Sequence, residues 1–224
     1  MSARRAVLLV GSARPSGTGN SEALGAYLLA RLAEGGLKAE VFHVARCQRP
    51  EKEELLLAAV DRADVFVLST PLYVDALPYL VTRTAERIAA HRATQPEKSA
   101  VRFLAMVNCG FPEWEQTRTA LDICRAFTRQ AGFEWVGGLG LGGGEAIHGR
   151  PLEELGGQTR NLRRGLDLTA EALLAGRVVP EEAQAMLARQ AVPSRLYTAI
   201  GSLGWLRAAR RQGTLRKLGD RPLE

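Results

Sequence analysis

One stretch decides how this chain is expected to fold: Val7-Leu-Leu-Val-Gly11-Ser12-Ala-Arg14-Pro-Ser16-Gly17-Thr18-Gly19-Asn20-Ser21-Glu22-Ala-Leu24. An apolar run stops at a segment rich in glycine and hydroxyls, and apolar residues at helical spacing follow. This pattern predicts a strand, a loop and a helix. The first amides of a helix lack partners inside it and its dipole is positive there, so such a loop can bind an anion.

The loop supplies many hydrogen-bond donors besides its backbone. Its glycines, Gly19 among them, let the main chain approach a phosphate closely. Further candidate donors are the side chains of Ser12, Arg14, Ser16, Thr18, Asn20 and Ser21. An ordinary loop between a strand and a helix has a similar composition, and this alternative stays open because short glycine-rich motifs carry false positives.

Residues that the loop lacks exclude two classes of phosphate-containing ligand. The loop has no Gly-Lys-Ser/Thr, so the lysine and metal-binding hydroxyl of a nucleoside-triphosphate loop are absent. It also lacks the glycine spacing of a dinucleotide turn. Hydroxyls in place of that glycine suit a terminal phosphate monoester, which favours a mononucleotide such as FMN.

The rest of the chain alternates predicted strands and helices. The run at 63–70 is continuously apolar, as in a strand buried on both faces of a parallel sheet. Such alternation predicts a doubly wound α/β sandwich. We expect further strands at 38–44, 101–107 and 133–141, and helices at 51–61, 78–91, 113–131, 152–174 (interrupted by Gly156-Gly157) and 180–190.

In doubly wound sheets, ligands lie beyond the carboxyl ends of the strands. The loops after the first, third, fourth and fifth strands should therefore meet. The latter three are Thr70-Pro71-Leu72-Tyr73-Val74-Asp75, Asn108-Cys109-Gly110-Phe111-Pro112-Glu113 and the segment from Gly142-Gly143-Gly144 to Gly149. They combine apolar surface for a flat ring with main-chain donors and acceptors for its polar edge.

Composition limits the class of protein. The chain has 224 residues, 46% of them hydrophobic, which suffices for a substantial core. It contains no apolar run of membrane-spanning length and no signal-peptide pattern, so we expect a cytoplasmic protein. Three cysteines without C-x-x-C spacing support neither a disulfide framework nor a zinc site, and no metal is expected.

With these motifs the sequence resembles the NADPH-dependent FMN reductase family of flavodoxin-like oxidoreductases. The resemblance covers about residues 5–145. The Thr-Pro-x-Tyr element at 70–73 is its most specific match, beside the first loop and the segment 108–113. It implies a flavodoxin-like sheet of five parallel strands in the order 2-1-3-4-5 over residues 1–176, with a basic helical extension over 177–224.

The resemblance also implies roles for individual residues. Ser12, Arg14, Asn20 and Ser21 would hold the FMN phosphate, and Ser16, Thr18 and Gly19 belong to the same loop. The isoalloxazine ring would lie beside Thr70, Pro71, Leu72, Tyr73 and Val74, with Asn108, Cys109, Gly110, Phe111 and Gly143 along its other edge. NAD(P)H would be the co-substrate, the acceptor a small molecule such as a flavin or quinone, and the protein a homodimer.

The protein need not supply a nucleophile for such chemistry, since the cofactor carries it. We therefore predict no catalytic residue. Tyr73 stacks on the ring or caps the next helix. Cys109 is expected to be an apolar filler, Glu113 a first-turn helix acid and His148 a surface histidine.

The segment after Pro193 carries most of the excess charge of a chain with net charge +6. Leu196, Ile200 and Leu203 recur at helical spacing, and arginines follow. Packing on the same domain or on a dimer partner is the favoured interpretation, because the glycines at 201, 204 and 213 weaken a free-standing helix. Contact with an anionic membrane is less favoured, and nucleic acid is not expected.

Three functions remain after these arguments. The first is an FMN-dependent NAD(P)H oxidoreductase. The second is a flavodoxin-type electron carrier, against which a pI near 9.6 argues mildly, since such carriers are commonly acidic. The third is a flavodoxin-like structural or regulatory module without flavin.

Overall fold

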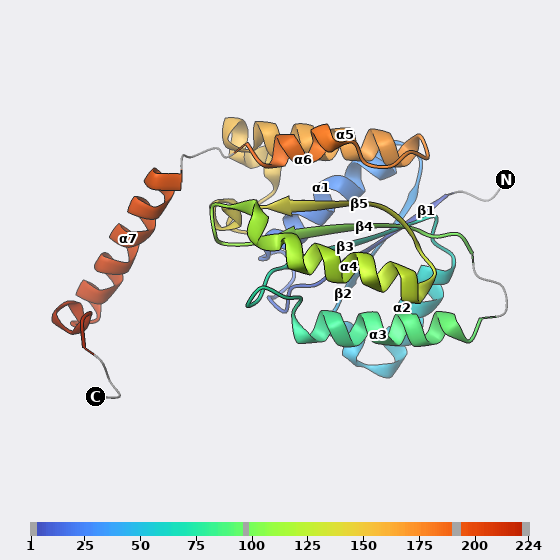
Figure 1. The fold of residues 1–224 in the computed structure, drawn as a ribbon, viewed down its shortest axis with the longest axis horizontal. Helices are drawn as coiled ribbons and strands as arrows, with labels where there is room; N and C mark the ends of the chain where they lie inside the picture. The colour runs from blue at the N-terminus through green and yellow to red at the C-terminus, as the bar shows by residue number, and fades with distance from the viewer. Residues whose placement is uncertain (1–3, 96–98, 190–193, 221–224) are drawn as a thin grey trace. The chain divides into compact units, whose positions relative to one another are not determined.

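The computed structural model describes residues 4–95, 99–189 and 194–220 (Figure 1). The chain divides into two compact units, Met1–Arg189 and Gln190–Glu224. The first unit is a three-layer sandwich with a central sheet. The second contains the helix α7 (Ser194–Arg211) and a short 3-10 turn, Leu215–Lys217.

The central sheet is entirely parallel and has the strand order β2-β1-β3-β4-β5, which confirms the flavodoxin-like prediction. Its inner strands are buried on both faces, as their apolar runs indicated, whereas β2 is half exposed at one edge. The strands are β1 (Arg5–Val10), β2 (Lys38–His43), β3 (Val65–Pro71), β4 (Arg102–Asn108) and β5 (Glu134–Leu141).

Helices cover both faces of the sheet and enclose two apolar cores (Figure 1). One face carries α1 (Asn20–Glu34), α5 (Arg160–Leu174) and α6 (Glu181–Leu187). The opposite face carries α2 (Pro50–Asp61), α3 (Tyr79–Ala93) and α4 (Arg118–Ala131). Right-handed crossovers between parallel strands account for this distribution. The chain moves in one direction across the sheet from β1 to β2 and in the other direction from β2 to β5, so α1 lies on one face and α2 to α4 lie on the other.

Two predicted helices differ in detail from their expected form. The helix expected at 113–131 starts as a 3-10 turn, Trp114–Thr117, whose Thr117 hydroxyl donates to the Trp114 carbonyl at 2.7 Å, and α4 follows. The helix expected at 152–174 is divided as predicted: Gly156, with φ 55°, interrupts the 3-10 stretch Leu152–Thr159, and α5 follows from Arg160.

The short helix after Pro180 belongs to the first unit, which ends at Arg189 and so extends past the boundary expected at residue 176. The side-chain amide of Gln184 in this helix pairs with the backbone of β5 at Gly140. The Gly140 N–H donates to Gln184 Oε1 at 2.8 Å, and Gln184 Nε2 donates to the Gly140 carbonyl at 3.1 Å. The Val179 amide donates to the Val136 carbonyl. These bonds satisfy part of the β5 edge, which would otherwise attract another strand. Gln190, also expected in this helix, lies outside the described residues.

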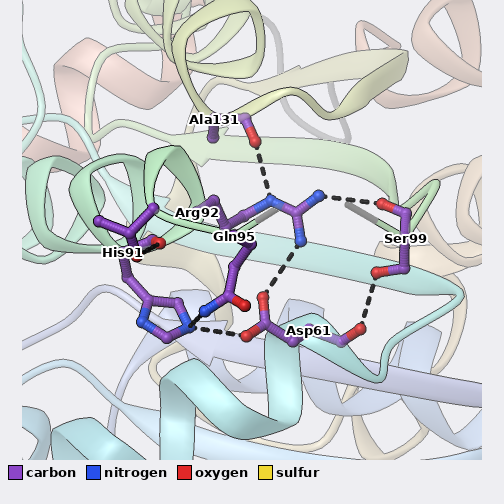
Figure 2. A network of polar contacts seen from close by, with 7 residues as sticks. Asp61, His91, Arg92, Gln95, Ser99 and Ala131 are labelled. Atoms are coloured by element: carbon purple, nitrogen blue, oxygen red, sulfur yellow. Dashed lines mark hydrogen bonds and ion pairs between the residues drawn. The ribbon is translucent and has the colours of Figure 1, made fainter. Parts of the chain in front are cut away.

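A buried arginine, Arg92 on α3, links three helices at the end of the sheet where the strands begin (Figure 2). The Arg92 side chain is 1% exposed and donates to the carbonyls of Ala131 and Ser99 at 2.8 and 2.9 Å. It pairs with Asp61 at 3.2 Å, and its guanidinium lies 4.6 Å from the centre of the Phe133 ring. Each of the three guanidinium nitrogens of Arg92 therefore has a hydrogen-bond acceptor inside the fold, and its charge is paired with Asp61.

Replacing Arg92 with methionine should lower the free energy of unfolding by about 2–4 kcal/mol, because two carbonyls lose their donor and the Asp61 carboxylate keeps only its contact with His91. Urea denaturation followed by circular dichroism measures this loss. The matched control is Arg164→Met on α5, where the arginine is exposed and pairs with Glu171 at 3.7 Å. It should change stability by no more than about 0.5 kcal/mol. Equal effects of the two substitutions would show that the buried network contributes nothing.

Candidate functional site

A pocket lies where the carboxyl ends of β1, β3 and β4 meet the N-terminus of α1, as the convergence of loops predicted. Its empty volume is about 420 Å³, which includes open solvent at the mouth. The residues that line it are Ser12, Arg14, Asn20, Ser21, Pro71, Leu72, Tyr73, Asn108, Cys109, Gly110 and Glu145.

Gly11 permits the close approach of β1 to β3 that opens the first loop. A Cβ at this position would lie 2.5 Å from Thr70 Oγ1 and 2.8 Å from a Val81 methyl group. The Gly11 amide donates to the Ser69 carbonyl at 2.8 Å, which continues the strand pairing to this point. A side chain here would therefore push the loop away from the sheet.

A chain of buried hydrogen bonds fixes the N-terminus of α1 to the sheet. The Ser69 hydroxyl donates to the Ser21 carbonyl at 2.6 Å, and the Ser21 hydroxyl donates to Asn108 Oδ1 at 2.7 Å. All three residues are at most 5% exposed. Because the bonds join β3, α1 and β4, they set the distance between the first loop and the loop after β4.

Asn20 joins the first loop to the loop after β5. Its side-chain Oδ1 accepts a hydrogen bond from the Gly149 amide at 2.8 Å. The two N–H donors of the Asn20 side chain are therefore those on Nδ2. At Gly149 a Cβ would lie 2.4 Å from the Thr18 carbonyl oxygen, and φ is 67°. Glycine is thus required where these two loops touch.

The N-terminus of α1 offers donors to a ligand. No side chain caps the helix at Gly19, and within the described part of the chain the amides of Asn20 and Ser21 have no acceptor. Both residues line the pocket beside Ser12 and Arg14. Free amides, the helix dipole and a guanidinium are groups that attract an anion.

Ser16 and Thr18 lie elsewhere than in the pocket lining, although the loop composition made them candidate phosphate ligands. The Ser16 hydroxyl donates to Glu22 Oε1 at 2.9 Å, and the Gly17 amide donates to Glu22 Oε2 at 2.6 Å. The Thr18 hydroxyl donates to the Pro15 carbonyl at 2.7 Å. Both hydroxyls therefore form hydrogen bonds within residues 15–22, and those to Glu22 connect the loop to the first turn of α1.

On the opposite wall, Pro71, Leu72 and Tyr73 line the pocket. The Leu72 amide donates to the Asn108 carbonyl at 2.8 Å, which extends the pairing of β3 with β4 to the pocket. The neighbouring candidate Thr70 is fully buried beneath this wall, and its hydroxyl contacts the Pro71 carbonyl at 3.2 Å. This side of the pocket therefore offers flat, mainly apolar surface.

Tyr73 opens a tight turn at the pocket mouth. Its amide and carbonyl pair with those of Ala76 at 3.0 and 3.1 Å, while Val74 and Asp75 have φ of 49° and 59°. A β-branched residue rarely adopts this conformation. The Val74 side chain is 97% exposed at the tip and does not line the pocket, and Tyr73 is 50% exposed. Strained backbone of this kind gathers at ligand sites.

The loops after β4 and β5 hold one another through backbone bonds. The Gly143 amide donates to the Phe111 carbonyl at 2.6 Å, and the Gly144 amide donates to the Cys109 carbonyl at 2.9 Å. The Phe111 side chain is 58% exposed, and neither it nor Gly143 lines the pocket. Their backbones support the wall that Asn108, Cys109 and Gly110 form.

Glu145 is a pocket residue that the sequence did not single out. Its carboxylate lies 4.0 Å from the Arg14 guanidinium across the pocket, and both side chains are about half exposed. Its position in the glycine-rich loop after β5 was the available signal. Among the described residues no cluster of His, Cys, Asp and Glu could hold a metal ion.

The cysteines are buried thiols. Burial raises the pKa of the Cys109 thiol, and the nearby Glu113 carboxylate raises it further, while a hydrogen bond from the Phe111 backbone partly opposes this rise. Burial also raises the pKa of Cys47 to about 11 and that of Cys124 to about 12. Because thiolates are the reactive form, these pKa shifts fit the role of apolar filler expected for Cys109.

We predict that Cys109 reacts at least about tenfold more slowly with a disulfide reagent at pH 8 than a free cysteine peptide does, because a raised pKa lowers its thiolate fraction. The rate should climb as pH rises from 8 to 10. A Cys47→Ser, Cys124→Ser double variant isolates Cys109, and the same variant in guanidinium provides the fully reactive control. Rapid labelling of the native variant at pH 7 would instead identify an activated thiol.

Comparisons with known proteins show what the fold resembles. No protein-family model matches the chain. No curated protein matches it either. Solved structures do match, and those with a TM-score above 0.5 share the flavodoxin-like fold.

One matching structure is an NADH:FMN oxidoreductase in its apo form, with TM-score 0.55, 14% identity and coverage of 84% of this chain and 96% of that one. Another is an NAD(P)H:quinone oxidoreductase from Methanothermobacter marburgensis, with TM-score 0.52, 16% identity and coverage of 84% and 99%. A flavone reductase matches with TM-score 0.56 and 13% identity, over 75% of this chain and 63% of that one. This chain therefore spans less than two thirds of the flavone reductase.

Proposed function

We propose that the protein is an FMN-dependent oxidoreductase that takes hydride from NAD(P)H and passes electrons to a small-molecule acceptor. The observation that carries the proposal is the pocket to which the loops after β1, β3, β4 and β5 all contribute, with the uncapped N-terminus of α1 at one side. The names of the solved structures with this fold, an NADH:FMN oxidoreductase and a quinone oxidoreductase, agree with it.

The residues present fit the phosphate of FMN. The amides of Asn20 and Ser21 lack acceptors among the described residues, and Ser12 and Arg14 stand beside them. The Ser21 hydroxyl already donates to Asn108, so Ser21 would contribute its backbone rather than its side chain. A phosphate here would also compete with Glu145 for the Arg14 guanidinium.

The other walls fit a flat ring. Pro71, Leu72 and Tyr73 offer it a surface, and Asn108, Cys109 and Gly110, which follow the neighbouring strand β4, also line the pocket. Bound flavin supplies the hydride and electron chemistry, and this chain's share is binding, orientation and exclusion of water. In that role Asn108 is held by Ser21, and the Cys109 carbonyl is held by the Gly144 amide.

A flavodoxin-type electron carrier and a flavin-free module are the competing functions, and one experiment separates all three. The purified protein is titrated with FMN and then given NADPH or NADH without oxygen. We expect stoichiometric FMN uptake and rapid bleaching of the yellow absorbance. Uptake without bleaching would indicate a carrier, and failure to take up FMN would indicate a module without flavin.

Arg14→Met should weaken FMN binding about tenfold, because a half-exposed charge-assisted hydrogen bond to phosphate is lost. Binding of riboflavin, which has no phosphate, should stay unchanged. Fluorescence quenching of each flavin measures both affinities. Arg118→Met is the matched control, because this arginine lies over the Trp114 ring and not in the pocket lining. If Arg14→Met weakened riboflavin equally, Arg14 would not be the phosphate ligand.

A further inference from the structure

The positive charge of the protein is concentrated in its second unit. Residues 190–224 contain seven lysines and arginines and two acids, which leaves the other 189 residues with a net charge of only +1 out of +6. The pocket and its proposed chemistry make no use of this charge. An acidic partner is the natural complement of such a segment.

Along α7, apolar and basic residues are separated end to end. The segment 196–206 contains no charged residue, and Arg207, Arg210, Arg211, Arg216 and Lys217 follow it. As a helix, eleven residues extend ~16 Å, about half the hydrocarbon thickness of a bilayer. Consistent with this length, none of the described helices is long and apolar enough to cross a membrane. A segment of this length suits the interface of a membrane instead.

In the described part of the second unit, the large apolar side chains after residue 202 are exposed. Leu203, Trp205 and Leu206 are 54%, 78% and 45% exposed, and Leu215 and Leu218 are exposed after them. The side chains of Leu196 and Ile200, predicted on the same face as Leu203, lie outside the described part of the chain. An exposed tryptophan next to arginines is typical of segments at a lipid surface.

We propose that α7 and the basic residues after it dock on an anionic lipid surface. Charge complementarity selects this partner over a second copy of the chain, because the rest of the protein is nearly neutral. The exposed leucines and Trp205 select it over nucleic acid, which would need the charge but not the apolar residues. Each basic side chain near anionic lipid adds attraction that falls off within a Debye length, so the docking is salt-dependent. It is independent of flavin.

The test uses the full chain and vesicles of phosphatidylcholine with or without 30% phosphatidylserine. Co-sedimentation in 0.1 M salt should be at least tenfold stronger with phosphatidylserine and should fall in 0.5 M salt. Tryptophan emission should shift to the blue on binding, and Trp205→Phe should remove that shift, because Trp114 and Trp135 belong to the first unit.

Charge reversal locates the binding surface. The double variant Arg210→Glu, Arg211→Glu should lose phosphatidylserine binding at least tenfold. Its matched control is Arg125→Glu, Arg129→Glu on α4, which makes the same change in net charge at exposed positions and should bind as the unchanged protein does.

Three results would overturn the proposal. One is equal binding to both kinds of vesicle or none to either. Another is binding of a DNA or RNA oligonucleotide that depends on the tail while vesicles are ignored. The third is a dimer, measured by sedimentation, that dissociates in the Arg210→Glu, Arg211→Glu variant while vesicle binding is absent.

Discussion

The buried hydrogen bonds from Ser69 to Ser21 and from Ser21 to Asn108 are the constraint on which the site depends. They attach the N-terminus of α1 to the carboxyl ends of β3 and β4, so the unpaired amides of the helix face the pocket. Because Ser69, Ser21 and Asn108 are buried, each of these polar groups needs a partner inside the fold, and these bonds supply it. The same bonds position Ser21 and Asn108 in the pocket lining.

The two ends of the sheet differ in how they are held together. Two apolar cores hold the sheet between its helical layers, and the Arg92 network ties α2, α3 and α4 at the far end. At the pocket end, glycines at 11, 143, 144 and 149 let four loops approach one another at backbone distance. The Tyr73–Ala76 turn at the pocket mouth holds Val74 and Asp75 at positive φ.

Much of the fold was predictable because periodicity and continuous apolar runs report burial directly. The five strands and the interruption at Gly156 were predicted correctly from these patterns, and the strand order was implied correctly by the family resemblance. The site was predictable in part: ten of the expected residues line the pocket, but the sequence could not tell which hydroxyls of the first loop face inward. The Glu22 carboxylate accepts hydrogen bonds from the Ser16 hydroxyl and the Gly17 amide, so Ser16 is turned away from the pocket. This contact depends on the geometry of the loop and not on its composition. Glu145 and the Gly149–Asn20 contact likewise require residues far apart in sequence to meet.

The central claim is that the N-terminus of α1 receives the phosphate of a flavin mononucleotide. A crystal structure of the protein grown with FMN tests it most directly. The account predicts phosphate oxygens about 3 Å from the amide nitrogens of Asn20 and Ser21, with the ring between Pro71–Tyr73 and Asn108–Gly110. Phosphate bound away from α1, or a ring lying outside these two walls, would contradict it.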